Sequence, residues 1–170
     1  MSEPKQLSLI PDPNFGAIFN ENRKHRYVLW RIWNVQLPKL MFIGLNPSTA
    51  NEFIGDNTIR KLNKITMYNG FGGYYMTNLF AIISSDPKIL KTCTDPIGDN
   101  DFYLKQTSKQ CEKIIFCWGN FKEANERSVE VMQMFNDAYC LIQNKNGTPK
   151  HPLYCKDQTK IIPFNKLLLI

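Results

Sequence analysis

Short apolar runs alternate with helical patterns along most of the chain. Apolar runs of strand length cover residues 27–33, 39–44, 74–80, 113–119 and 138–142. Between them, apolar side chains recur at helical spacing over about residues 58–69 and 121–135, and a weaker pattern predicts a helix over 100–110. Strands that alternate with helices favour a parallel sheet covered on both faces. We therefore predict an α/β fold, a three-layer α/β/α sandwich around a mainly parallel central sheet of about four strands.

Proline, glycine and capping residues predict the boundaries of the domain and of its first helix. Residues 1–26 contain three prolines and a glycine and are expected to form an irregular leader, which leaves residues 27–170 as a single α/β domain. In the first helix the apolar positions share one face. Asp56 or Asn57 is the expected N-cap, and Gly70 is the expected stop.

Composition and charge indicate a folded protein with an anionic partner. The chain has 170 residues, 43% of them hydrophobic, and a formal net charge of +6. This balance fits a nucleic acid, with DNA as the first expectation, or a nucleotide, although many basic proteins bind neither. Arg31 belongs either to a solvated edge strand over residues 27–33 or to a basic rim that faces an anion.

Cysteine spacing and hydropathy count against several other classes. The five cysteines include no Cys-x-x-Cys pair, so we expect neither a zinc site nor a redox motif, and no other metal or cofactor is implied. No apolar run approaches the roughly 20 residues that span a bilayer. Residues 1–6 lack a signal-peptide pattern. We therefore expect a cytoplasmic protein that does not enter a membrane.

Three predicted strands end in glycine or small polar residues. The first ends at Gly44 and continues into Leu45 and Asn46, the second ends in Thr77-Asn78, and the third in Trp118-Gly119. In a parallel sheet these carboxyl ends share one edge, where ligands bind on the loops that follow the strands. The sequence therefore predicts a site at that edge. The alternative is an ordinary strand-to-helix connection, since Asn, Pro and Ser favour turns for local reasons.

Six short motifs together are specific enough to suggest a family. They are Gly44-Leu45-Asn46-Pro47-Ser48-Thr49-Ala50, Asp56-Asn57-Thr58, Asn78-Leu79-Phe80-Ala81, Asp86-Pro87, Trp118-Gly119 and His151-Pro152-Leu153-Tyr154. This combination resembles the bacterial and viral family called domain of unknown function 1643. The resemblance runs from about Tyr27 to Tyr154, and the family name implies no activity.

The order of the same motifs also resembles the uracil-DNA glycosylase superfamily. Its members have a first loop of the type Gly-x-Asn-Pro-Gly or Gly-x-Asp-Pro-Tyr, a middle strand that ends in a polar base reader, a later Trp-Gly and a late His-Pro-Ser loop. The counterparts here are residues 44–48, Thr77-Asn78, Trp118-Gly119 and residues 151–153. The resemblance implies a three-layer fold, a pocket for an extruded base at the strand carboxyl ends, and cleavage of an N-glycosidic bond by water attack.

Each side chain of such a site has an implied role. The catalytic pair would be Asn46, which positions the attacking water, and His151, which donates a hydrogen bond to the departing anionic base. Asn78 would read the edge of the base, and Phe80 or Phe53 would stack on its ring. The remaining residues that the resemblance assigns to substrate binding are Gly44, Leu45, Pro47, Ser48, Thr49, Asp56, Trp118 and Gly119. Basic residues within 23–26 and 60–64 would hold phosphates.

Each of these roles has a plainer alternative. His151 can cap a loop through its neighbours, and Asn78 can satisfy backbone groups at the end of a strand. Phe80 can belong to the core, and Trp118 can be structural. Asp56 is most simply the N-cap of the first helix. It is also a reserve candidate for water activation or metal binding.

The sequence departs from the superfamily pattern at three positions. The first loop has Asn46 rather than Asp. Ser48 stands where the Asn-type members have Gly, and Leu153 stands where a Ser would contact phosphate. Two other functions therefore stay open. One is a non-catalytic protein that binds nucleic acid or a nucleotide. The other is an enzyme that acts on free nucleotides and uses Ser48, Thr49 and the following helix N-terminus to bind an anion.

Overall fold

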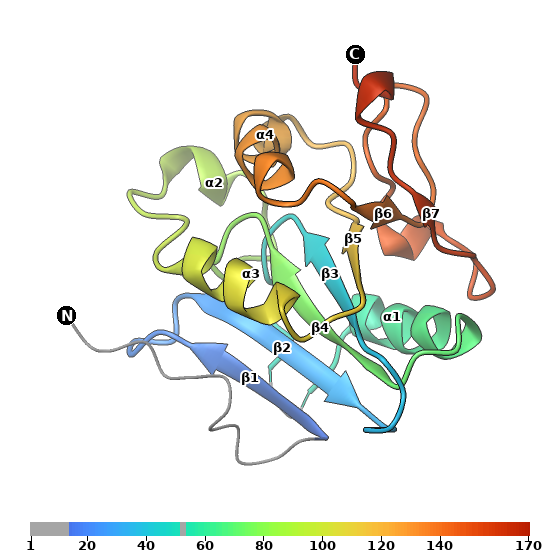
Figure 1. Cartoon of the computed structure of the whole chain (residues 1–170). Helices are drawn as coiled ribbons and strands as arrows, with labels where there is room; N and C mark the ends of the chain where they lie inside the picture. Colours follow the sequence, from blue (N-terminus) through green and yellow to red (C-terminus); the bar gives the residue numbers. More distant parts are fainter. Residues whose placement is uncertain (1–13, 52–53) are drawn as a thin grey trace.

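The computed structural model describes residues 14–51 and 54–170, and at its centre is one seven-stranded sheet (Figure 1). The strands are β1 (Phe15–Phe19), β2 (Arg26–Ile32), β3 (Leu40–Gly44), β4 (Gly73–Asn78), β5 (Lys113–Phe116), β6 (Tyr139–Cys140) and β7 (Ile162–Pro163). Their order across the sheet is β1-β2-β4-β3-β5-β6-β7. The fold is therefore α/β, as the sequence predicts.

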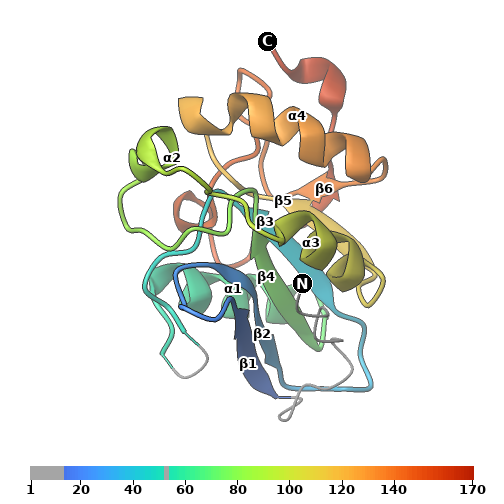
Figure 2. The ribbon, with the colours of Figure 1, turned by 90° about the vertical axis from the view of Figure 1, so that its left-hand side faces the viewer.

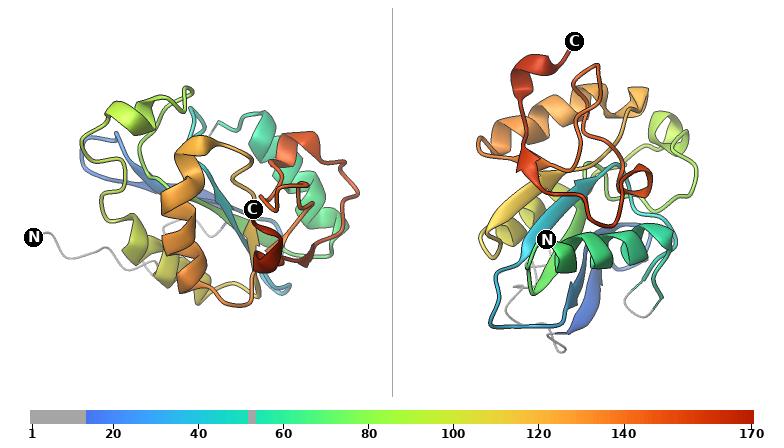
Figure 3. Two further views of the ribbon diagram at one scale, coloured as in Figure 1. Left: turned by 90° about the horizontal axis from the view of Figure 1, so that it is seen from above. Right: turned by 90° about the vertical axis from the view of Figure 1, so that its right-hand side faces the viewer.

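Helices cover both faces of this sheet. The α-helices are α1 (Asn57–Tyr68), α2 (Ile89–Thr92), α3 (Asn100–Ser108) and α4 (Asn125–Met134). Short 3₁₀ helices are η2 (Lys122–Ala124), η3 (Pro152–Tyr154) and η4 (Lys166–Leu168). α1 and η3 lie side by side on one face, and α3 and α4 lie on the other (Figures 2 and 3). Among the described residues, none of these helices combines the length and the apolar character that a membrane crossing requires.

The sheet is mixed and larger than predicted. Its four middle strands, β4, β3, β5 and β6, run parallel, which accounts for the strong strand-helix alternation in the sequence. Three further strands pair antiparallel: β2 with β4, β1 with β2, and β7 with β6. The prediction of about four strands in a mainly parallel sheet is therefore wrong in size and in the direction of the outer strands.

The first 26 residues are not all irregular. Residues 1–13 lie outside the described part of the chain, but residues 15–19 form β1, so the predicted leader is wrong there. Gly16 makes this pairing possible, because a Cβ at that position would lie 2.1 Å from the Trp30 ring. β1 also makes β2 an interior strand. Arg31 is accordingly half-buried and donates hydrogen bonds to the Trp30 and Asn51 carbonyl oxygens, so the expected solvated edge strand is wrong as well.

A β-bulge in β2 changes the face that its first side chain occupies. Ile18 of β1 pairs with Val28, but the next residue, Phe19, pairs with Arg26, so Tyr27 is an extra residue in β2. Regular alternation would place Arg26 on the same face as Val28, which belongs to the core on the α3 side. The bulge instead allows Arg26 to line a cavity on the α1 side of the sheet.

The α1 helix forms where the sequence predicts it. Its buried positions include Leu62 and Ile65, which pack against the sheet on the face of Phe42. Asp56 is the N-cap, because its side chain accepts a hydrogen bond from the Ile59 backbone N–H at 2.9 Å. The helix ends at Tyr68, just before Gly70. This cap fixes the loop that leads from β3 into α1.

Candidate functional site

A cavity of about 200 Å³ lies at the carboxyl ends of β3, β4 and β5. Gly44 of β3 pairs with Asn78 of β4, and the Cys117 N–H donates to the Ile43 carbonyl, so Asn78, Gly44 and Cys117 form one row across three strands. The N-terminal end of α1 and the loop before η3 close the cavity. Parallel pairing therefore brings together segments that are far apart in the chain.

Seven of the predicted site residues line this one cavity. They are Gly44, Leu45, Asn46, Ser48, Asp56, Asn78 and His151. The two predicted catalytic residues and the predicted base reader are thus neighbours in space. Their convergence follows from the parallel middle strands, whose carboxyl ends meet at one edge.

Asn78 is a buried amide without a hydrogen-bond partner. Its side chain is 1% exposed, and neither Nδ2 nor Oδ1 bonds to another described residue. Gly44 provides the space for it, because a Cβ on Gly44 would lie 2.7 Å from Asn78 Oδ1. Leaving such a group unsatisfied costs about 1–3 kcal/mol per polar atom. The alternative that Asn78 satisfies backbone groups at the strand end is therefore wrong.

The main chain of Asn78 is held from the opposite face of the sheet. Asn100, the first residue of α3, is fully buried, and its Nδ2 donates to the carbonyl oxygens of Asn78 at 2.8 Å and of Leu79 at 3.1 Å. Arg127 of α4 also donates to the Leu79 carbonyl, at 2.9 Å. These bonds fix the backbone from which the Asn78 side chain enters the cavity.

Asn46 connects the first loop to the loop after β4. Its Nδ2 donates to the Ser84 carbonyl at 2.9 Å and lies within 3.4 Å of the Ile82 carbonyl. The amide nitrogen is therefore committed to the fold. The Asn46 Oδ1 can accept a hydrogen bond from a ligand or a water molecule.

Asp56 is a carboxylate of the cavity wall with both oxygens engaged. Oδ1 accepts from the Ile59 N–H, and Oδ2 accepts from the Ser48 hydroxyl. The Ser48 side chain is consequently oriented by Asp56. Both residues line the cavity, but their strongest polar contacts are to each other and to α1.

His151 is held as a neutral ring with a defined tautomer. Its Nδ1 accepts from the Leu153 N–H at 3.2 Å, which leaves the proton of the neutral imidazole on Nε2. Burial lowers the pKa of His151, and the nearby Asp56 carboxylate offsets part of this shift. At neutral pH the side chain therefore offers an uncharged N–H donor. It also caps η3, so the predicted structural and functional roles are compatible.

Arg26 supplies positive charge to the same cavity. Its side chain is 3% exposed, and one guanidinium nitrogen donates to the Ala50 carbonyl. Desolvation lowers the pKa of Arg26 to about 10, and Asp56 opposes the shift. The Arg26 guanidinium therefore stays charged at neutral pH.

Cys117 is also in the cavity wall, but burial raises the pKa of its thiol, so it is not an activated nucleophile.

Five predicted site residues do not line this cavity. Phe80 and Trp118 are buried in the core on the α3 and α4 side of the sheet and do not reach this cavity. Thr49 is exposed, and Pro47 is buried with its carbonyl accepting from the Ser84 N–H at 2.9 Å. Gly119 lies on an adjacent groove. Phe53, the other candidate for stacking, lies outside the described residues.

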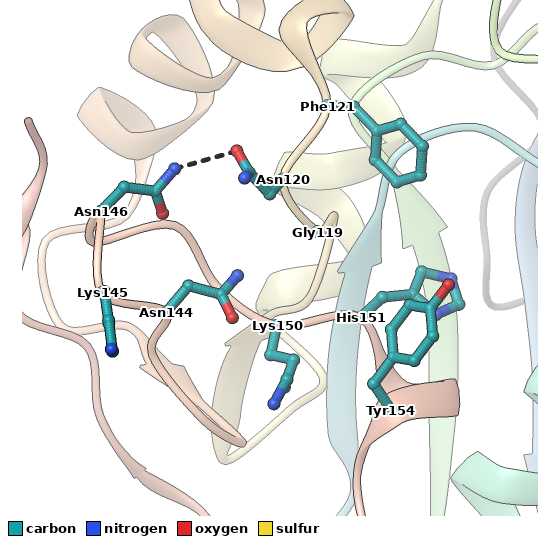
Figure 4. A pocket seen from close by; sticks show the side chains of 9 residues that line it. All are labelled: Gly119, Asn120, Phe121, Asn144, Lys145, Asn146, Lys150, His151 and Tyr154. Carbon is teal, nitrogen blue, oxygen red and sulfur yellow. Dashed lines mark hydrogen bonds between the residues drawn. The ribbon is translucent and has the colours of Figure 1, made fainter.

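The adjacent groove is polar and basic (Figure 4). It measures about 640 Å³ and shares Phe121 and His151 with the cavity. Lys145 and Lys150 extend from the loop before His151, and no carboxylate is among the lining residues. Tyr154, which is 76% exposed, contacts the His151 ring edge-on at a centroid distance of 6.1 Å. The groove thus leads away from the cavity past the rings of Phe121 and Tyr154.

Sequence reasoning did not place several residues in the cavity wall, among them Phe121, Cys117 and Arg26. Phe121 was expected only on the buried stripe of a helix, yet its ring lies at the junction of cavity and groove. Cys117 was expected only as a buried structural thiol. Arg26 was expected in the leader among the basic residues of 23–26 that would hold phosphates, and its inward position depends on the bulge, which no sequence pattern marks. The basic residues Lys61 and Lys64, proposed for phosphate binding, instead form ion pairs with Asp157 at 2.7 and 3.3 Å.

The described residues contain no cluster of three or more His, Cys, Asp or Glu side chains placed to hold a metal ion.

The family model described as "Protein of unknown function (DUF1643)" matches residues 26–153, which include the strands and loops that form the cavity. No curated protein and no solved structure matches the chain.

Proposed function

We propose that this chain, which belongs to the DUF1643 family, binds a nucleobase in the cavity and acts as a glycosylase-like enzyme that cleaves the N-glycosidic bond of that base in DNA. The observation that carries the proposal is the Asn78 side chain, which is buried with both polar atoms unsatisfied at the cavity. An amide donor next to an amide acceptor complements the paired acceptor and donor on the edge of a base. A bound base would satisfy both atoms at once.

The size of the cavity supports a ligand of one ring. An engineered apolar cavity of about 150 Å³ binds benzene, so about 200 Å³ is suited to a six-membered ring with small substituents. Phe121 supplies an aromatic surface at the rim, and base–aromatic stacking contributes about 1–3 kcal/mol per base. A pyrimidine is therefore the best-fitting class of base.

The polar groups around the cavity match the charges that glycosidic cleavage develops. The departing base becomes anionic, and the neutral His151 Nε2–H would donate to it as its charge grows. Asn46 Oδ1 would accept a hydrogen bond from a water molecule and orient it toward the sugar carbon, because its Nδ2 is already bonded to the protein. Asp56 is the reserve for water activation, since a neutral amide is a poor general base.

The adjacent groove favours a polymer over a free nucleotide. A base inside the cavity would leave its sugar and phosphate at the mouth, where the groove carries Lys145 and Lys150 without an opposing carboxylate. Tyr154 is exposed there and would stack on a flanking base. The motif order of the uracil-DNA glycosylase superfamily points to the same substrate class, although Leu153 replaces its phosphate-contacting Ser.

The test is release of free base from oligonucleotides that carry different pyrimidines, including modified ones. The wild-type chain should release at least one base, and Asn46→Ala and His151→Ala should each lower the rate by 10²-fold or more. Thr49→Ala is the matched control, because Thr49 is exposed in the same loop and does not line the cavity. Unchanged unfolding temperatures would exclude misfolding as the cause of a lost activity. Equal rates in all four proteins would refute the catalytic assignment.

A non-catalytic binding protein is the second candidate. It is favoured by Asp56, whose two oxygens are already engaged by Ser48 and the Ile59 N–H, which leaves the cavity without a free carboxylate to activate water. This function predicts binding of DNA that contains the target base and no release of that base. The same engagement of Ser48 counts against the third alternative, an enzyme on free nucleotides that uses this hydroxyl to bind an anion. Binding of oligonucleotides that Asn78→Leu abolishes, without any base release, would establish the second function over the first.

A further inference from the structure

Arg26 is positioned toward the cavity by an irregular feature of the sheet. The bulge at Tyr27 removes Arg26 from the face of Val28 and places it in the cavity wall. Bulges that re-aim a side chain are typical of sheet regions next to binding sites. Of the residues that line the cavity, Arg26 is the one with a permanent positive charge.

The guanidinium group of Arg26 has an unused donor inside the protein. Its Nε is fully buried and has no hydrogen-bond partner, while another of its nitrogens donates to the Ala50 carbonyl. Among the described residues no carboxylate forms an ion pair with it, and the nearby Asp56 directs its own oxygens to Ser48 and the Ile59 N–H. Burying a cation costs free energy unless it is paired and hydrogen-bonded. An acceptor with negative charge would meet both needs of the Arg26 guanidinium, since its Nε lacks a hydrogen-bond partner.

This requirement is separate from the one that Asn78 imposes. The amide of Asn78 is neutral and needs one donor and one acceptor, whereas Arg26 Nε needs an acceptor that offsets a full charge. Both groups line the same cavity of about 200 Å³. A ligand that satisfies both must combine a polar ring edge with an anionic oxygen inside a cavity of about 200 Å³.

We propose that Arg26 binds an anionic oxygen of the ligand, so that the base taken by this cavity is a pyrimidine carrying an acidic substituent such as a ring carboxylate. This inference rests on the proposed function, because it assumes that Asn78 reads a base. To the proposed function it adds the chemical class of the base. An unsubstituted pyrimidine would leave the buried guanidinium unpaired and would bind more weakly.

The experiment measures the binding of free bases by isothermal titration calorimetry. The probes are uracil, 5-carboxyuracil and 6-carboxyuracil, which share one ring and one polar edge. Wild-type protein should bind a carboxylated base about 10- to 100-fold more tightly than uracil, the range expected for a charge-assisted hydrogen bond to a buried group. Arg26→Gln should remove this preference and leave the affinity for uracil within about threefold.

Arg31→Gln is the matched control. Arg31 is the other arginine of β2 and also donates to the first loop, at the Asn51 carbonyl, but it is half-buried and does not line the cavity. It should therefore keep the preference for the carboxylated base. Loss of the preference in both variants would show that Arg26 acts only by holding the loop, and would overturn the proposal.

Two further outcomes separate this inference from the proposed function. Binding of uracil with no gain from a carboxyl group at either position would refute the role of Arg26 while leaving the nucleobase cavity in place. Benzoate, a ring with a carboxylate and no base edge, tests the opposite case. If benzoate binds in an Arg26-dependent way and neither carboxyuracil exceeds its affinity, the anion subsite stands and the nucleobase function is wrong.

Discussion

Replacing Asn78 by leucine should stabilise the protein and abolish binding of the base. The side chain of Asn78 is 1% exposed, and both of its polar atoms are buried without partners. Each such atom costs about 1–3 kcal/mol, and leucine has a similar size without polar groups. The two atoms together cost about 2–6 kcal/mol. Because a water molecule in the cavity would satisfy part of the amide, we expect the free energy of unfolding to rise by about half of this sum, about 1–3 kcal/mol.

Urea unfolding followed by tryptophan fluorescence measures this change. In a chain of this length, a gain of 1 kcal/mol corresponds to a rise of about 2–4 °C in Tm, so a thermal scan gives an independent value. Calorimetry with the preferred carboxyuracil would show the loss of affinity in the same variant. A stability gained at the expense of binding is the pattern expected of a functional residue.

Asn100→Leu provides the control for this prediction. Asn100 is the same residue type and is equally buried, and its Oδ1 also lacks a partner, but its Nδ2 donates two hydrogen bonds to main-chain carbonyls. Its replacement should lower the free energy of unfolding by about 2 kcal/mol or more. If Asn78→Leu destabilises the protein as much as Asn100→Leu does, the Asn78 amide has structural partners and the case for a polar ligand at this position collapses.

Three other changes test separate parts of the site. Gly44→Ala should lower stability by about 1–3 kcal/mol in urea unfolding and weaken base binding, because its Cβ would lie 2.7 Å from Asn78 Oδ1; unchanged binding would contradict this. The pKa of His151 is lower in the folded protein than in the unfolded chain, so the unfolded chain takes up the proton first as the pH falls. The stability that His151 contributes is therefore present above about pH 6.5 and is lost as the pH falls through the lowered pKa. Tm measured from pH 8 to pH 5 should therefore fall less in His151→Gln than in wild type, and parallel curves would argue against this. Replacing Lys145 and Lys150 by glutamine should reduce the salt-dependence slope of single-stranded DNA binding by about 1.4, and an unchanged slope would place the strand elsewhere.

The parallel core was predictable because its strands carry unambiguous signals. β3 is a continuous buried apolar run that ends in glycine, and α1 combines an apolar stripe with an Asp56 cap. The outer strands lack such signals. β1 follows proline-rich sequence and contains Gly16, which is required there only because the Trp30 ring leaves no room for a Cβ. β7 consists of Ile162–Pro163 alone. Pairing between distant segments, which local sequence does not encode, determines these strands.

The candidate site was predictable to the extent that it depends on strand ends. Asn46 and Asn78 follow or end parallel strands, so their convergence required only the correct strand direction. Phe80 lies two residues beyond the end of β4, where the strand alternation no longer holds, and its ring enters the opposite core. Arg26 could not be placed in the cavity from the sequence, because the bulge that directs it appears only in the register of β1 against β2.

Because the Asn78 main chain is bonded to Asn100, ligand recognition depends on residues behind the sheet as well as on those in the cavity. Asn100 belongs to α3, behind the sheet, and Arg127 of α4 reaches the neighbouring Leu79 carbonyl from the same side. A substitution in the packing of these helices would tilt the backbone at the end of β4 and misalign the amide in front of it by a fraction of an ångström. Random mutagenesis selected for lost ligand recognition should therefore recover changes on the rear surface, in residues that no ligand touches.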